Sequence, residues 1–124
     1  MSDLRTHRDL DAWKLSLDWV EAVYRCSASW LSDERFGLIS QVRRAAVSVA
    51  ANIAEGAGRN GTGEFVHFIG IARGSLAEVQ THLLIASRLG YLTTDHLQTL
   101  LADMERIGRM LSGLSTRLKQ RHKT

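Results

Sequence analysis

Apolar residues recur along most of this 124-residue chain at intervals of three and four positions, which is the spacing of a helix with one buried face. Short polar or glycine-rich breaks separate four such runs. They predict helices over about residues 9–28, 33–56, 63–89 and 94–119. The seven-residue repeat within each run favours helices that cross at about 20°. The pattern therefore predicts one all-α domain spanning residues 1–124.

The breaks between the predicted helices are short. Ser32, followed by two acids, is typical of a helix N-cap, and Thr62 and Thr94 stand at the start of the last two helices. Four glycines between residues 56 and 63, and Gly90, mark the helix ends. Because connections this short join antiparallel neighbours, we expect an antiparallel up-down-up-down four-helix bundle.

The second predicted helix is apolar on nearly every face. Between Ala45 and Ala57 its only polar side chains are Ser48, Asn52 and Glu55. A helix that is hydrophobic all round is a buried one. Since one bundle core covers only part of that circumference, we expect identical chains to cover the rest in a homo-oligomer.

The first predicted helix carries two apolar seams on opposite faces. We assign the seam through Leu17 and Tyr24 to the core of the subunit and the seam through Trp19 to a partner. An exposed apolar stripe is usually an interaction site, with self-association favoured over a lipid or a foreign helix. The predicted oligomer interface comprises Leu15, Trp19, Ala22, Val47, Ala50, Ala51, Ala54, Phe68 and Ile71.

Composition places the chain among cytoplasmic proteins. It has no proline and a single cysteine, Cys26, which suits long helices and a reducing compartment. The first residues are too charged for a secretory signal. The longest stretch free of charged residues, Ala45 to Ala54, is about half of the roughly 20 residues that span a bilayer. We therefore expect no membrane partner.

Basic residues dominate the later part of the chain. The net charge is +3 overall, and no acid follows Arg106. A basic tail over residues 117–124 is compatible with nucleic acid, although cations also suit the end of a helix for electrostatic reasons. The candidate nucleic-acid contacts are Arg43, Arg44, Arg59, Arg73, Arg88, Arg117, Lys119 and Arg121.

Two motifs that could carry chemistry do not support an enzyme. The segment from Gly56 to Gly61 matches G-x-G-x-x-G, but it follows a helix and not the strand that a dinucleotide site requires. Glu64 and His67 form a single Glu-x-x-His pair that would face outward, whereas di-iron bundles use two inward-facing pairs. No nucleophile, base and orienting acid can be assigned. We expect no catalytic residues, no cofactor and no metal.

A line of polar residues runs along the apolar second helix, because Gln41, Ser48 and Glu55 are seven residues apart. With Asn52 and Glu78 they predict a hydrogen-bonded network that fixes register inside or between subunits. A ligand site is the alternative interpretation.

Several segments resemble one known family. Residues 41–48 (QVRRAAVS), residues 52–56 (NIAEG) with Arg59, and residues 72–78 (ARGSLAE) are similar to the four-helix-bundle proteins encoded in intervening sequences of bacterial 23S ribosomal RNA genes. The similarity covers about residues 10–92. Residues 29–31 depart from the family pattern, in which an aromatic residue followed by proline is usual, so the shape of the first connection stays open.

The resemblance implies a homopentameric, and therefore homo-oligomeric, ring of antiparallel bundles with a positively charged surface, related to the accessory variability determinant proteins of diversity-generating retroelements. Those relatives bind nucleic acid and a reverse transcriptase. We therefore expect a non-enzymatic homo-oligomer that associates with RNA or DNA. One alternative is a scaffold that docks a protein, such as a reverse transcriptase, through Trp19, Trp30 and nearby apolar surface; another is an oligomer with a structural role alone.

Overall fold

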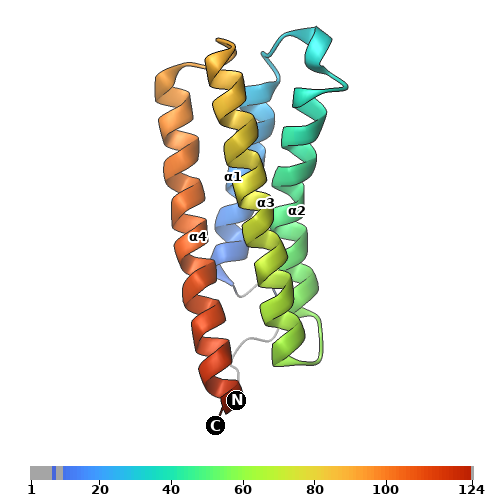
Figure 1. Cartoon of the computed structure of the whole chain (residues 1–124), viewed down its shortest axis with the longest axis vertical. Coiled ribbons are helices and arrows are strands. Elements are labelled where there is room, and N and C mark those ends of the chain that lie inside the picture. The colour runs from blue at the N-terminus through green and yellow to red at the C-terminus, as the bar shows by residue number, and fades with distance from the viewer. Residues whose placement is uncertain (1–6, 8–9, 124) are drawn as a thin grey trace.

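The computed structural model of the chain describes residue 7 and residues 10–123. Four long helices lie side by side in it (Figure 1), and no strand is present in these residues. The helices are α1 (Asp11–Ser27), α2 (Leu38–Ala57), α3 (Thr62–Arg88) and α4 (Thr94–Lys123), with a short 3-10 helix, η2 (Ser32–Glu34), between α1 and α2. The predicted all-α class is confirmed.

The four helices surround one core. Helix α1 packs against α2 and α4, and α3 packs against the same two helices, so that the contacts close a ring in the order α1, α2, α3, α4. The contact between α2 and α3 is the most extensive. Figure 1 shows the α1–α2 and α3–α4 connections at one end of the bundle, and the α2–α3 connection at the other end, together with the last residues of α4.

The predicted core seams of α3 and α4 are confirmed. The residues at the three- and four-residue spacing are all buried: Phe65, Ile69, Ala72, Leu76, Val79, Leu83 and Ala86 on α3, and Leu97, Leu100, Met104, Ile107, Leu111, Leu114 and Leu118 on α4. Truncating a buried leucine or isoleucine to alanine costs about 2–5 kcal/mol, so this line of side chains supplies much of the stability of the bundle.

The two faces of α1 are the reverse of the prediction. Trp19 is 1% exposed and its indole Nε1 donates to the carbonyl oxygen of Leu100 at 3.2 Å, whereas Leu17 is 44% exposed and Tyr24 is 40% exposed. The buried line of α1 also includes Ser16 and Ser27, whose hydroxyls donate to carbonyl oxygens three residues earlier. Because these serines satisfy their own hydrogen bonds, they occupy core positions that a hydrophobicity pattern assigns to the surface.

Helix α2 begins at Leu38 and not near residue 33, because residues 32–34 form the separate η2 turn. The carboxylate of Glu34 accepts a hydrogen bond from the Leu38 amide at 3.4 Å and another from the Tyr91 hydroxyl at 2.9 Å. Glu34 therefore satisfies one of the free amides at the start of α2 and ties it to the α3–α4 connection.

The remaining helix ends differ from the prediction by small amounts. Thr93, one residue before the predicted cap, accepts the hydrogen bond from the His96 amide at 3.1 Å. Thr62 is the first residue of α3, and Gly61 is its N-cap. Helix α4 continues to Lys123, so the predicted basic tail is helical through that residue. Residue 124 lies outside the described part of the chain.

Gly56 lets the end of α2 approach the start of α3. A β-carbon at this position would lie 2.8 Å from Cβ of Phe68 and 3.0 Å from Cδ1 of Phe65. The first glycine of the G-x-G-x-x-G match therefore lies in a contact between two helices. This position fits a glycine near the end of a helix and not one in a phosphate-binding loop.

Candidate nucleic-acid interface

Arg43 joins α1 to α2 within the subunit. Its Nε donates to Oγ of Ser27 at 2.8 Å, and its Nη2 donates to the carbonyl oxygen of Tyr24 at 3.0 Å. The guanidinium also lies 4.6 Å from the centre of the Tyr24 ring. Since the side chain is half-buried and its donors are engaged, this predicted phosphate contact has a structural role.

Arg59 is held in a similar way at the α2–α3 connection. It forms ion pairs with Glu55 at 2.9 Å and with Glu64 at 3.5 Å, and it lies over the Phe68 ring at 5.0 Å. Two carboxylates offset its charge, so Arg59 adds little positive potential to the surface.

The arginines Arg44, Arg73 and Arg88, on α2 and α3, are exposed. Arg44 is on α2 and Arg88 is at the last residue of α3. Arg73 lines a shallow groove of about 560 Å³ between α3 and α4, which it shares with Arg109. The eight predicted contacts therefore do not form a single patch.

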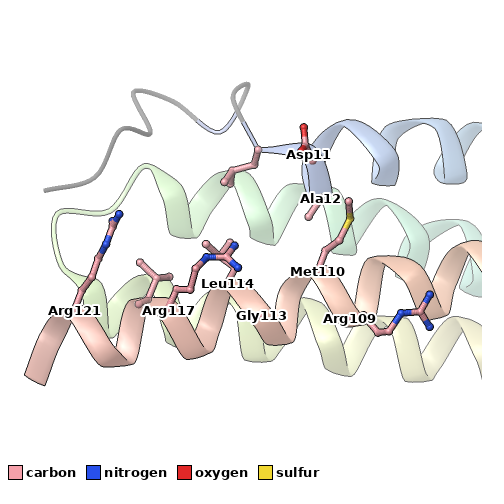
Figure 2. A pocket seen from close by; sticks show the side chains of 10 residues that line it. Asp11, Ala12, Arg109, Met110, Gly113, Leu114, Arg117 and Arg121 are labelled. Atoms are coloured by element: carbon pink, nitrogen blue, oxygen red, sulfur yellow. The ribbon is translucent and has the colours of Figure 1, made fainter.

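The basic residues that do come together lie along the second half of α4. There, a groove of about 420 Å³ runs between α4 and the start of α1 (Figure 2). We call it the α1–α4 groove; its lining residues are Leu10, Asp11, Ala12, Arg109, Met110, Gly113, Leu114, Arg117, Leu118 and Arg121. Two predicted contacts, Arg117 and Arg121, are brought together with Arg109, which lies in the acid-free run after Arg106 but was not among the predicted contacts.

The α1–α4 groove has an apolar floor and a cationic rim. Leu10, Leu114 and Leu118 are each 6% exposed, whereas the three arginines are exposed. Asp11 is the one acid among the described lining residues. Arg109 and Arg117 thus add positive charge along this rim, which attracts anions.

Lys119, the remaining predicted contact in this part of α4, is exposed but does not line the α1–α4 groove.

The predicted oligomer interface divides into buried and exposed residues. Trp19 and Ala50 are 1% and 7% exposed within one subunit, so their assignment to a partner-facing surface was wrong. Leu15 and Ala22 are half-buried and pack against the same core. The residues that stay accessible lie on α2 and α3: Val47, Ala51 and Ile71 are exposed, and Ala54 and Phe68 are half-buried.

Trp30, which was expected to help dock a protein, is 5% exposed and belongs to the core. Its ring lies 6.1 Å from that of Tyr91, centre to centre. The two tryptophans on which the scaffold alternative depended are therefore both inside the subunit.

Two of the five predicted network residues are connected at the α2–α3 contact. The hydroxyls of Ser48 and Ser75 lie 2.9 Å apart, and Nδ2 of Asn52 donates to Oγ of Ser48 at 2.9 Å. Ser75 was not foreseen, because a single serine within an apolar seam gives no distinctive signal.

The other three predicted network residues lie elsewhere. Glu55 pairs with Arg59, Glu78 lies 3.9 Å from Nε2 of His82, and Gln41 is exposed. The structure therefore holds a compact polar contact and not a continuous line along α2.

Other candidate chemistry finds little support in the described residues. They contain no group of three or more histidine, cysteine, aspartate or glutamate side chains that could hold a metal ion. His67 packs edge-on against the Phe68 ring, and burial raises the pKa of the Cys26 thiol, which disfavours a thiolate nucleophile. Within the same residues, none of the helices has the length and apolarity that crossing a bilayer requires.

Comparisons with known proteins agree with this fold. The bundle is similar to the crystal structure of a protein of unknown function from the S23 ribosomal protein family of Bacteroides thetaiotaomicron, with a TM-score of 0.78 and 20% sequence identity. The similarity covers 85% of this chain and 95% of that one. None of the curated proteins matches this chain. Residues 8–113 match the family described as 23S rRNA-intervening sequence protein, beyond the residues on which the resemblance was recognised, and the chain therefore belongs to that family.

Proposed function

We propose that this protein is a non-enzymatic homo-oligomer that associates with RNA through the basic surface of α4. In this proposal each subunit is an antiparallel up-down-up-down bundle, and subunits close into the pentameric ring that the family resemblance implies. DNA is the alternative nucleic acid.

The observation that carries the RNA proposal is the gathering of Arg109, Arg117 and Arg121 on one groove. Arginine forms forked hydrogen bonds with phosphate better than lysine does. Contacts with phosphates release counterions, so binding should weaken steeply with salt and depend little on sequence. The helical course of residues 117–123 supports this, because it holds these side chains along one element instead of a flexible tail.

The exposed apolar residues on α2 and α3 support self-association. Val47 is 42% exposed and Ile71 is 38% exposed, and neighbouring small residues such as Ala51 allow two helices to approach closely. In the ring of helix contacts, the α2–α3 side lies across the bundle from the α1–α4 side. Self-association through α2 and α3 would therefore leave the α1–α4 groove open to RNA.

Two measurements test this function. Light scattering after gel filtration should give a mass of several subunits at micromolar protein concentration, and a stable folded monomer would contradict the oligomer. Binding of structured RNA, measured between low and physiological salt, should fall steeply as salt rises. No binding, or a response that salt does not change, would contradict the RNA association.

A second candidate function, docking of a partner protein, is favoured by a different surface. Phe36 is 86% exposed and Leu31 and Leu89 are each 54% exposed, all on the connections at one end of the bundle (Figure 1). Large apolar side chains that gather on an exposed surface mark an interaction site. Capture of a partner from nuclease-treated lysate, a reverse transcriptase being the partner that the resemblance suggests, should be lost on Phe36→Ser. Capture that disappears with the nuclease alone would contradict direct docking.

A further inference from the structure

The α1–α4 groove combines two chemistries that a simple phosphate contact does not need. Its floor is made by the buried leucines Leu10, Leu114 and Leu118, while Arg117 and Arg121 stand at its rim (Figure 2). A ligand that fills such a groove needs a flat or apolar body next to an anionic group. An unpaired nucleotide has both, because each base has an apolar face and its phosphate is charged.

The volume of the groove also fits a nucleotide. A volume of about 420 Å³ lies within the range of small-ligand pockets, roughly 300–1,000 Å³. In a duplex, the faces of the bases are stacked inside the helix and are not available to an apolar floor. In a single strand the bases can be splayed out and inserted. The groove therefore fits one or two unpaired nucleotides better than a helical surface.

The positions of the arginines allow contacts with a strand that runs along α4. Arg117 and Arg121 are one helical turn apart, about 6 Å along the axis, and Arg109 precedes Arg117 by about 12 Å. Phosphates on both sides of an inserted base could thus be reached. Asp11, in the first turn of α1, is the acid on the opposite side, so the positive charge is concentrated on α4.

Gly113 keeps the middle of the groove open. It lies between Arg109 and Arg117 on α4, and a β-carbon built on it would approach Nη1 of Arg117 at 3.4 Å. The Arg117 side chain therefore lies along α4 over Gly113, as Figure 2 shows. A larger residue at position 113 would occupy the floor next to this guanidinium, without any change in charge.

We infer that the α1–α4 groove is a binding site for unpaired nucleotides of an RNA strand, with the base on the leucine floor and the flanking phosphates on Arg117, Arg121 and Arg109. This inference rests on the proposed RNA association and narrows it to single-stranded RNA at one site.

The test compares three full-length variants, using an unstructured oligouridine of about 12 nucleotides and an RNA duplex of the same length as probes. Gly113→Leu fills the groove at constant charge, and Arg117→Glu reverses a rim charge. Arg35→Glu makes the same charge reversal at an exposed arginine that is not a candidate contact, in the α1–α2 connection at the other end of the bundle, and serves as the matched control. Circular dichroism and gel filtration establish that each variant keeps the helical fold and the oligomeric state of the parent.

The parent should bind the single strand more tightly than the duplex. We expect Gly113→Leu to weaken single-strand binding about tenfold with little change in salt dependence, since it removes base contacts and not ion pairs. Arg117→Glu should weaken binding and also reduce the slope of log affinity against log salt by roughly 0.7 for each phosphate that the protein no longer neutralises. Arg35→Glu should stay within about twofold of the parent, because it touches neither the floor nor the rim.

The outcomes distinguish this inference from the proposed RNA association on which it rests. RNA binding by the parent that Gly113→Leu leaves unchanged, or equal affinity for duplex and single strand, would overturn the groove assignment and leave the RNA association standing. Failure of the parent to bind either RNA at low salt would overturn both.

Discussion

Nε of Arg43 donates a hydrogen bond of 2.8 Å to Oγ of Ser27, a residue that is completely buried in the first helix. Ser27 in turn donates to the carbonyl oxygen of Tyr24, and Arg43 reaches that same carbonyl through Nη2. The guanidinium thus closes a small network between α1 and α2. The sequence alone predicts Arg43 to be a surface cation, but in the structure it connects two helices of the subunit.

Removing this guanidinium should destabilise the fold. We expect Arg43→Ala to lower the free energy of unfolding by about 1–3 kcal/mol, because it removes the hydrogen bonds that the guanidinium donates to the Ser27 hydroxyl and to the Tyr24 carbonyl oxygen. Arg43→Lys should recover only part of the loss, since an ammonium does not reproduce the planar fork. Urea unfolding measures the effect. The adjacent Arg44→Ala removes an exposed cation and should change stability by less than about 0.5 kcal/mol; an equal loss in both variants would contradict the structural role of Arg43.

Replacing Gly56 by alanine and replacing Gly70 by alanine should change the stability of the protein in opposite directions. Gly56→Ala places a methyl group 2.8 Å from Cβ of Phe68, so α2 and α3 must separate at their closest point, and we expect a loss of about 1–3 kcal/mol. Gly70 is an exposed residue within α3, and a β-carbon there meets nothing within 4 Å. Gly70→Ala should therefore stabilise the protein by up to about 1 kcal/mol, as expected for alanine in a helix. Thermal unfolding of the two variants should shift in opposite directions, and a gain from Gly56→Ala would contradict the close approach.

Periodicity was sufficient to predict the helices and most of the core, because the seams of α3 and α4 consist entirely of apolar residues. It failed on α1, where both faces are apolar. There the decision depends on where the large Trp19 ring and the self-satisfied hydroxyls of Ser16 and Ser27 fit against the other helices. Which of two apolar faces is buried is a property of the assembled bundle and not of the helix.

The candidate site was harder to predict for a related reason. The sequence identifies the cationic residues but not those whose side chains already have partners within the subunit. The partners of Arg43 and Arg59 become visible only when the helices pack. The α1–α4 groove likewise depends on Leu10 and Ala12 lying beside the second half of α4, about a hundred residues later in the sequence. The acid-free run after Arg106 indicated the helix that carries the groove but not the side of that helix that faces it.

The pKa of the Tyr91 hydroxyl predicts how the stability of the protein changes at alkaline pH. The hydrogen bond to Glu34, with a contribution from burial, raises the pKa of the Tyr91 hydroxyl above its ordinary value of about 10. Since the folded pKa is raised, this stabilisation is complete below the unfolded pKa and is lost as pH rises through the folded pKa. Stability should therefore decline above about pH 10 more in the parent than in Tyr91→Phe. Urea unfolding at several alkaline pH values tests this, and identical declines would show that the Glu34 contact does not contribute.

Val47 provides the sharpest prediction about assembly, because it is an exposed apolar residue on α2 that the subunit core does not need. In the proposed oligomer, Val47→Glu would bury an unpaired carboxylate between subunits, which costs several kcal/mol and should weaken association by at least about tenfold. Leu17 is the matched control, since it is 44% exposed on α1 compared with 42% for Val47, and Leu17→Glu makes the same chemical change away from α2 and α3. Light scattering over a range of concentrations should show dissociation of Val47→Glu with its helical circular dichroism retained, while Leu17→Glu keeps the parent mass. If Leu17→Glu dissociates and Val47→Glu does not, the subunits associate through the exposed side of α1 instead.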